Sequence, residues 1–167
     1  MIKALIFDWG DTLMKDFPQY SGPMASWPEV ELMPNVQNAL EQLSAHYTIA
    51  VASNAGDSDC LLMREAFKRA DVDKYIHHVF TSRELGYEKP DLQFFNQTVT
   101  QLGVNPTQAV MIGNDYAKDI SPAKKAGLHT VFYTSTMFLD SLVDADFLIR
   151  NMKKLPAVIE LLNCTTP

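Results

Sequence analysis

Short runs of apolar and β-branched residues recur along the chain, and segments with helical periodicity lie between them. The expected strands cover residues 3–7, 47–52, 77–81, 109–113, 129–133 and, more weakly, 146–149. The expected helices cover residues 34–46, 59–70, 92–103, 118–127 and 154–163. Because strands that alternate with helices form crossover connections, this order predicts a mainly parallel sheet flanked by helices. We therefore expect an α/β, three-layer, Rossmann-like fold.

Length and composition limit what else the chain can contain. Its 167 residues suit one domain spanning 1–167, and 47% hydrophobic with 20% charged residues is ordinary for a globular protein. No apolar run approaches the roughly 20 residues of a membrane helix, and the start MIKALIF lacks the pattern of a signal peptide. The two cysteines, Cys60 and Cys164, are far apart in sequence, which argues against a disulfide framework. We expect a cytoplasmic protein that does not bind membranes.

The net charge limits the class of partner. A formal charge of −6 argues against nucleic-acid binding, which usually needs a basic face. A phosphorylated small molecule remains compatible, because one bound metal ion can reverse the sign of a pocket locally. Whether the chain forms a homo-oligomer stays open.

Polar residues follow the apolar runs at the points where the expected strands end. Asp8 follows the first run, Ser53 and Asn54 follow the second, and Asn114 and Asp115 follow the fourth. In open parallel sheets, ligands bind outside the carboxyl ends of the strands. The sequence therefore predicts that these side chains converge at one edge of the sheet.

A carboxylate that converges with an ammonium group and further acids suits phosphoryl transfer. A carboxylate nucleophile splits such a transfer into two steps through an aspartyl-phosphate. A divalent cation and fixed hydrogen-bond donors would stabilise the charge on the phosphoryl oxygens. Mg²⁺ prefers oxygen ligands, which the acidic residues offer and the histidines and cysteines of this chain do not. Mg²⁺ is therefore the expected cofactor.

Four motifs give the chain a resemblance to the haloacid dehalogenase superfamily, specifically to its phosphatase branch. The motifs are IFDWGDTL at 6–13, VASN at 51–54, EKPDLQFF at 88–95 and MIGNDYAKDI at 111–120. They occur in the order of the family, and the likeness covers nearly the whole chain. The resemblance implies a Mg²⁺-dependent phosphatase that acts on a phosphorylated small molecule or an exposed phosphoryl group.

The resemblance also implies a role for particular residues in each motif. Asp8 would take up the phosphoryl group, and Lys89 would neutralise both the nucleophile and the phosphoryl oxygens. Ser53 and the backbone N–H of Asn54 would bind a phosphate oxygen, although either residue could instead cap the following helix. The residues expected to hold or support the metal are Asp8, Gly10, Asn114, Asp115 and Asp119.

Two motifs depart from the family pattern. The family places an aspartate two residues after the nucleophile, where this chain has Gly10 followed by Asp11. The Gly10 carbonyl can still bind metal, but the residue cannot transfer a proton, and loss of such a group typically costs about 10²- to 10⁴-fold in rate. Asp11 can replace the missing acid only if the turn differs, because a shift by one residue tends to reverse side-chain direction. Asn114 offers a neutral oxygen where an aspartate is common, which predicts weaker metal binding.

Residues 14–34 break the alternation of strands and helices. Their prolines forbid a long helix, so we expect an extended, ordered loop near the site. The aromatic residues Phe17, Tyr20 and Trp27 either cover the site or pack in the core. This loop occupies a position where the family inserts a cap, and we expect no separate cap domain.

Other functions remain open on the sequence. Gly10 and Asn114 favour a catalytically weakened protein of the same fold that binds a phosphorylated ligand or a protein partner. Phosphoryl transfer to an acceptor other than water is a third alternative, and a true dehalogenase is disfavoured. The substrate is not named by the sequence, because specificity resides in loops and not in the fold.

Overall fold

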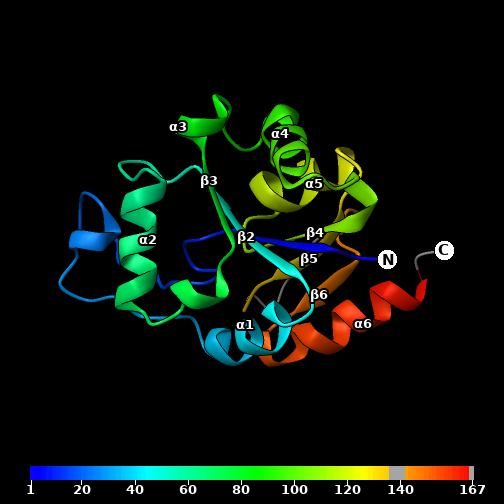
Figure 1. Cartoon of the computed structure of the whole chain (residues 1–167), viewed down its shortest axis with the longest axis horizontal. Coiled ribbons are helices and arrows are strands. Elements are labelled where there is room, and N and C mark those ends of the chain that lie inside the picture. Colours follow the sequence, from blue (N-terminus) through cyan, green and yellow to red (C-terminus); the bar gives the residue numbers. More distant parts are fainter. Residues whose placement is uncertain (136–141, 166–167) are drawn as a thin grey trace.

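The computed structural model describes residues 1–135 and 142–165, and it contains a parallel sheet flanked by helices (Figure 1). The sheet has six strands in the order β3-β2-β1-β4-β5-β6. The strands are β1 (Ala4–Phe7), β2 (Thr48–Ser53), β3 (His78–Thr81), β4 (Ala109–Gly113), β5 (His129–Tyr133) and β6 (Phe147–Ile149). The predicted fold class is confirmed, and each strand begins and ends within one residue of its expected bounds.

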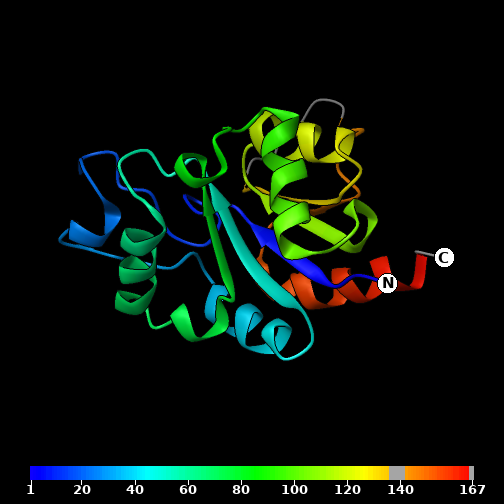
Figure 2. The same ribbon diagram turned by 45° about the horizontal axis from the view of Figure 1, so that its top comes forward.

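Helices cover both faces of this sheet, as the two views in Figures 1 and 2 show. The α-helices are α1 (Val36–Ser44), α2 (Cys60–Arg69), α3 (Ser82–Leu85), α4 (Leu92–Leu102), α5 (Ser121–Lys125) and α6 (Leu155–Thr165). A π-helical turn, Tyr116–Ile120, leads into α5. The 3-10 turns are Met24–Ser26, Asp73–Tyr75, Pro106–Gln108 and Met152–Lys154. No helix among the described residues is both long and apolar enough to cross a bilayer.

Alternation of side chains along the strands divides the core into two layers. Leu5 and Phe7 of β1 pack in the layer beneath α1, α2 and α6, whereas Ala4 and Ile6 face α4 and α5. The second layer is lined by small strand residues, including Ala50 and Ala52. Small residues there leave room for the aromatic rings of α4.

The segment from 14 to 34 is irregular and has no helix beyond its 3-10 turn, as its prolines predict. Phe17 and Trp27 are buried, and Tyr20 packs against both, with its ring centroid 5.6 Å from that of Phe17 and 5.7 Å from that of Trp27. Arg69 at the end of α2 donates to the carbonyl oxygens of Ala25 and Trp27, each at 2.7 Å. The loop is therefore held against α2.

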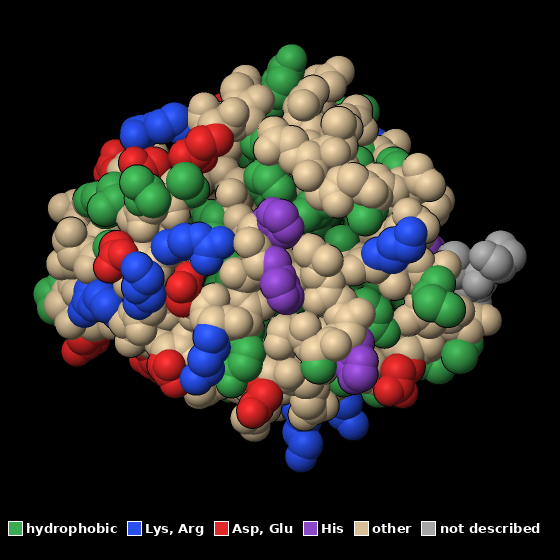
Figure 3. All heavy atoms as spheres, in the orientation of Figure 1, with side chains coloured by type: hydrophobic (Ala, Val, Ile, Leu, Met, Phe, Trp, Pro, Cys, Tyr) green, Lys and Arg blue, Asp and Glu red, His purple; other side chains and the backbone are tan. Residues whose placement is uncertain are grey.

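Charged side chains of both signs lie next to one another on the face of the molecule shown in Figure 3, mostly over its left and lower parts. Lys and Arg side chains lie among Asp and Glu side chains there and do not gather into one basic patch of described residues. Among the ion pairs of the described residues, those of Lys89 with Asp8 and Asp119 have the most buried side chains, and they lie at the carboxyl edge of the central strands.

Candidate active site

The register of the three central strands brings distant residues together. Phe7, the last residue of β1, pairs with Val51 of β2 on one side and with Ile112 of β4 on the other. Asp8 follows directly, and its backbone N–H donates to the carbonyl of Ile112 at 2.9 Å. Because parallel strands end at the same edge, Asp8 lies between the residues that follow β2 and β4.

Lys89 is the central cation of the site. Its side chain is 3% exposed, and its Nζ lies 2.5 Å from Asp8 Oδ1 and 2.7 Å from Asp119 Oδ1. The structure thus brings together three residues that are far apart in sequence and that the sequence analysis selected. A buried ammonium held by two carboxylates is fixed in position, which is what charge stabilisation at a reaction centre needs.

Burial and charge oppose each other in this triad. Burial favours neutral Lys89, but the Asp8 and Asp119 carboxylates outweigh burial and raise the pKa of Lys89. Burial raises the pKa of Asp119 to about 6. The charge of Lys89 opposes this increase, and the charge of Asp8 adds to it. Two carboxylates therefore compete for one ammonium group, and a further positive charge beside Asp8 would relieve their repulsion.

Asn54 fixes the backbone that carries Lys89. The Asn54 side chain accepts from the Lys89 N–H at 2.7 Å and donates to the Lys89 carbonyl at 2.9 Å. The sequence analysis gave Asn54 a backbone N–H for phosphate binding or a capping role, and this clamp was not predicted. Ser53 is buried and its Oγ accepts from the Ala55 N–H at 3.2 Å. The cap of α2 is Asp59, which accepts from the Leu62 N–H, so neither Ser53 nor Asn54 has that role.

Three oxygen-bearing groups converge on the other side of Asp8. One terminal atom of the Asn114 amide lies 3.1 Å from the Gly10 carbonyl oxygen, 3.0 Å from Thr12 Oγ1 and 3.3 Å from Asp8 Oδ2. As a nitrogen, this atom donates to the three oxygens. The hydrogen-bond partners favour this nitrogen in the metal-free site. With the amide turned by 180°, its oxygen completes with Asp8 and Gly10 the kind of oxygen cluster that Mg²⁺ prefers. Asp8, Gly10 and Asn114 therefore fit a cation.

Asp115 and Asp119 are turned to other partners. The Asp115 carboxylate accepts from the N–H groups of Ala117 and Lys118, both at 3.0 Å, and caps the π-helical turn. Asp119 Oδ2 accepts from the Asp115 N–H at 3.1 Å while its Oδ1 binds Lys89. Within residues 1–135 and 142–165, no group of three or more His, Cys, Asp and Glu side chains is arranged to hold a metal. A cation here would depend on one carboxylate and neutral oxygens.

Gly113 is required by the close approach of Asp119. A Cβ added at Gly113 would overlap the Asp119 carboxylate. Any larger residue would push Asp119 away from Lys89. The glycine at the end of β4 therefore allows the second half of the ion-pair triad to form.

The loop after β1 carries three polar side chains with different surroundings. Thr12 is fully buried, and its hydroxyl lies 3.0 Å from Asn114 Oδ1 and 3.4 Å from Asp8 Oδ2. Asp11 has a left-handed backbone (φ 54°), and its exposed carboxylate accepts from the Asp16 N–H at 2.9 Å. Thr12 and Asp16 were missed by the sequence analysis, because neither belongs to a strand end or to a periodic segment.

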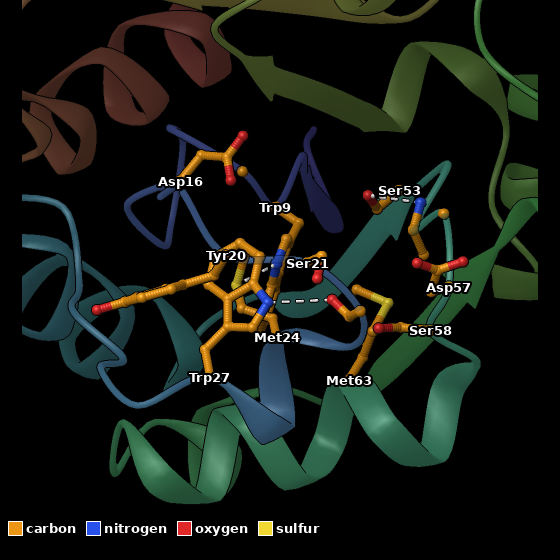
Figure 4. A pocket seen from close by; sticks show the side chains of 14 residues that line it. Trp9, Asp16, Tyr20, Ser21, Met24, Trp27, Ser53, Asp57, Ser58 and Met63 are labelled. Atoms are coloured by element: carbon orange, nitrogen blue, oxygen red, sulfur yellow. Dashed lines mark hydrogen bonds between the residues drawn. The ribbon is translucent and has the colours of Figure 1, made fainter. Parts of the chain in front are cut away.

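Two open cavities meet at this loop. The smaller, about 230 Å³, is bordered by the ion-pair triad, Asn114, Asp115 and Lys118. The larger, about 430 Å³, is bordered by Trp9, Tyr20, Met24, Trp27, Ser58 and Met63 (Figure 4). Gly10, Asp16 and Ser53 border both. Tyr20 and Trp27 therefore form an aromatic wall next to the charged site. The sequence left open whether these residues cover the site or pack in the core, and Trp27, which is also buried, does both.

Hydrogen bonds fix the wall of the larger cavity. The indole N–H of Trp27 donates to the Gly22 carbonyl at 3.0 Å, and that of Trp9 lies 2.8 Å from Met24 Sδ. Trp9 also packs edge-on against Phe67 of α2, with ring centroids 4.3 Å apart. Trp9 is therefore both a core residue and a cavity residue.

The sequence is similar to those of known phosphatases and matches one protein family. The profile of haloacid dehalogenase-like hydrolases matches residues 2–133. The chain is 32% identical over 119 residues to a ribulose-1,5-bisphosphate 5-phosphatase of Halopiger xanaduensis, covering 71% of this chain and 48% of the relative. It is 30% identical over 105 residues to a glyceraldehyde 3-phosphate phosphatase of Methanothermobacter thermautotrophicus, covering 62% of this chain and 45% of the relative.

The chain thus spans about half the length of these curated relatives. A similar solved structure is that of an uncharacterized protein from Listeria monocytogenes serotype 4b. It has a TM-score of 0.83 and 26% identity, and the match covers 98% of this chain and 99% of that one. The similarity in fold therefore extends over almost the whole of both chains.

Proposed function

The chain belongs to the haloacid dehalogenase-like hydrolase family, and from this premise we propose that it is a phosphatase that hydrolyses phosphate monoesters through an aspartyl-phosphate on Asp8. The observation that carries the proposal is the position of Asp8 between a buried ammonium and a cluster of oxygens. Asp8 Oδ1 is held by Lys89 Nζ at 2.5 Å, and Oδ2 faces the Gly10 and Asn114 side. The names of the two curated relatives, both phosphatases of small phosphorylated molecules, support the same reaction class.

Each group of the site has a part in this reaction. Asp8 attacks phosphorus, and the electron pair of the breaking P–O bond goes to the ester oxygen. Ser53 and the backbone N–H of Asn54 bind phosphoryl oxygens, while Lys89 balances their charge in a place that excludes water. Asn54, through its side-chain clamp, keeps Lys89 in position.

Mg²⁺ is the proposed cofactor. Asp8 Oδ2, the Gly10 carbonyl and Asn114 Oδ1 would hold it, and it would supply positive charge that polarises the phosphoryl group. Asp115 and Asp119 support this arrangement from outside, Asp119 by its ion pair with Lys89 and Asp115 by its bond to Asp119. We also propose that the loop from 14 to 34 takes the place of a cap over the site.

Rapid-quench kinetics with 4-nitrophenyl phosphate and Mg²⁺ test the proposal. We expect sustained release of nitrophenol by the wild type and none by Asp8→Asn, because an amide oxygen is too weak a nucleophile. The matched control is Asp71→Asn, an exposed residue whose left-handed backbone (φ 55°) an asparagine tolerates. Activity that persists in Asp8→Asn would exclude Asp8 as the nucleophile.

A second candidate is a protein that binds phosphorylated ligands without turning them over. Gly10 favours it, because this position carries no group that can transfer a proton. Isothermal titration with inorganic phosphate and Mg²⁺ separates the two functions. Binding that depends on Lys89, in a protein that releases no nitrophenol, would establish the binding function in place of the phosphatase.

A further inference from the structure

The proposed reaction needs a group that handles protons, and most acids of the site are already engaged. The ester oxygen must gain a proton as it leaves, and a water must lose one as it attacks the aspartyl-phosphate. Asp8 is the nucleophile, Asp119 is held by Lys89, and Asp115 caps a helical turn. The remaining carboxylates that border the smaller cavity are those of Asp11 and Asp16.

The space beside Gly10 is open. A Cβ added at Gly10 would meet no atom within 4 Å. The position borders both cavities, so a group in this space lies between the phosphoryl site and the aromatic wall. The leaving part of a substrate whose phosphoryl group is bound at Ser53 would pass through this space.

Asp16 is better placed than Asp11 to act there. Asp16 borders both cavities, as Gly10 and Ser53 do, and Figure 4 shows its carboxylate on the rim of the larger one. Its carboxylate makes no hydrogen bond or ion pair with the described residues that would occupy it. Asp11 is instead bound to the Asp16 backbone N–H at 2.9 Å and also borders a separate cavity lined by Tyr133. Asp11 thus holds the backbone of Asp16 in place.

We propose that Asp16 is the general acid and base of this site. It carries out the proton transfers that Gly10, which has no side chain, cannot perform. The inference rests on the proposed phosphatase function. As Asp8 Oδ1 forms its bond to phosphorus, the P–O ester bond breaks and the leaving oxygen takes the proton of the Asp16 carboxylic acid. The resulting carboxylate then takes a proton from water, the water oxygen bonds to phosphorus, and the P–O bond to Asp8 breaks. Phosphate leaves, and Asp16 is protonated again.

This assignment also defines the class of substrate that the site takes. The leaving group enters the cavity of about 430 Å³ bordered by Trp9, Tyr20 and Trp27. Flat aromatic side chains and methionine favour a leaving group with an apolar or aromatic surface. Phosphorylated aromatic alcohols therefore serve as probes that fill this cavity and still need a proton on departure.

The test compares two leaving groups in Asp16→Asn. 4-Nitrophenolate leaves without a proton, whereas the alkoxide of benzyl phosphate needs one. We expect Asp16→Asn to lower single-turnover cleavage of benzyl phosphate by about 10²- to 10⁴-fold and to leave the first turnover of 4-nitrophenyl phosphate within about tenfold. Because the second step still lacks its base, 4-nitrophenyl phosphate should give a stoichiometric burst followed by slow turnover.

The control is Glu29→Gln, an exposed carboxylate in the same loop that borders neither cavity. It should keep wild-type rates with both substrates. Equal losses on both leaving groups in Asp16→Asn would indicate a structural role and overturn the inference. The inference is also overturned if Asp11→Asn, and not Asp16→Asn, shows the leaving-group dependence.

Gly10→Asp provides a second test that does not depend on loss of activity. The open space beside Gly10 accepts the side chain, and the new carboxylate can transfer protons directly. In the Gly10→Asp background, we expect Asp16→Asn to lower the rate of benzyl phosphate cleavage by less than about tenfold. The reason is that the effects of removing two groups that perform the same proton transfer are not additive. An unchanged cost would overturn the inference.

The outcomes separate this inference from the proposed function. A wild type that is inactive on both substrates, with an active Gly10→Asp, would leave Asp8 as a working nucleophile and exclude Asp16 as the acid. Inactivity of both proteins would overturn the phosphatase function and the inference together. Activity that depends on Asp8 but not on Asp16 would overturn the inference alone.

Discussion

Lys89 carries one positive charge between two carboxylates in a part of the molecule that is almost closed to water. Replacing it by methionine keeps most of its volume but leaves Asp8 and Asp119 facing each other without a cation. Removing one partner from a buried ion pair typically costs about 3–5 kcal/mol. We expect Lys89→Met to lower the free energy of unfolding by this amount at pH 7, measured by urea denaturation without added metal.

The pH dependence of that loss follows from Asp119. Its pKa is raised to about 6 in the folded protein against an ordinary value of 3.8, so the folded state binds the proton more tightly than the unfolded state. Stability from this group therefore rises as pH falls from above 6 toward 4. Lys89 lowers the pKa of Asp119, so its removal raises that pKa further, and the deficit of Lys89→Met should shrink as the pH falls from above 7 toward 6, because protonation removes the repulsion. Lys124→Met, which breaks the more exposed Lys124–Asp146 pair, should cost about 0–1 kcal/mol. A deficit that grows on acidification would contradict the explanation.

Single residues of the site could be predicted to different degrees. Asp8 was found because it follows an expected strand, and Lys89 and Asp119 were found because they belong to motifs that resemble those of the family. Asp16 was not found, because a side chain in an aperiodic loop is placed by the path of that loop. The left-handed turn at Asp11 and its bond to the Asp16 N–H set that path, and no spacing rule in the sequence reports it.

At the scale of elements, Arg69 connects α2 to the loop that forms the aromatic wall. Its guanidinium donates to the carbonyls of Ala25 and Trp27 at 2.7 Å and to that of Pro28 at 3.4 Å. Arg69→Met should therefore speed amide hydrogen exchange across residues 20–28 by about tenfold, since losing hydrogen bonds to a charged group removes at least about 1.4 kcal/mol. Exchange in β1 should not change.

The same variant tests the role of the wall in binding. Arg69→Met should raise KM for benzyl phosphate more than KM for methyl phosphate, because only the larger leaving group reaches the wall. Lys68→Met is the matched control, since Lys68 is its exposed neighbour and pairs with Glu65 within α2. Equal changes for Arg69→Met and Lys68→Met would exclude the anchoring role of Arg69.

The secondary structure was predictable where the pattern of apolar residues extends over several turns or a whole strand. The main helices α1, α2, α4 and α6 and all six strands came from such patterns. The helix expected at 118–127 is divided into the π-helical turn Tyr116–Ile120 and α5, and the short helix α3 was missed, because four or five residues carry too little periodicity. The turn is set by the Asp115 cap and by the bonds of Asp119 to Lys89 and the Asp115 N–H, which are tertiary features.

At the scale of the whole molecule, the proposed cation site joins the start and the middle of the chain. Asp8 and Gly10 follow β1 and Asn114 follows β4, and these strands are neighbours at the centre of the sheet. A cation bound there exists only in the folded chain, so binding adds its free energy to the stability of the entire fold. Mg²⁺ should therefore raise the unfolding temperature of the protein, and a chelator should reverse the increase.

Asn114→Asp should lower the stability of the metal-free protein and raise the stability of the Mg²⁺-bound protein. In chelator, a second carboxylate 3.3 Å from Asp8 Oδ2 adds repulsion, so the unfolding temperature should fall below that of the wild type. With Mg²⁺, the same charge strengthens binding, and each tenfold gain in affinity adds about 1.4 kcal/mol at saturating metal. Calorimetry with and without Mg²⁺ measures both effects, with Asn38→Asp on the exposed side of α1 as the control. An equal Mg²⁺ shift in wild type and Asn114→Asp would place the cation away from Asn114, because a ligand that gains a full charge cannot leave the affinity of its metal unchanged.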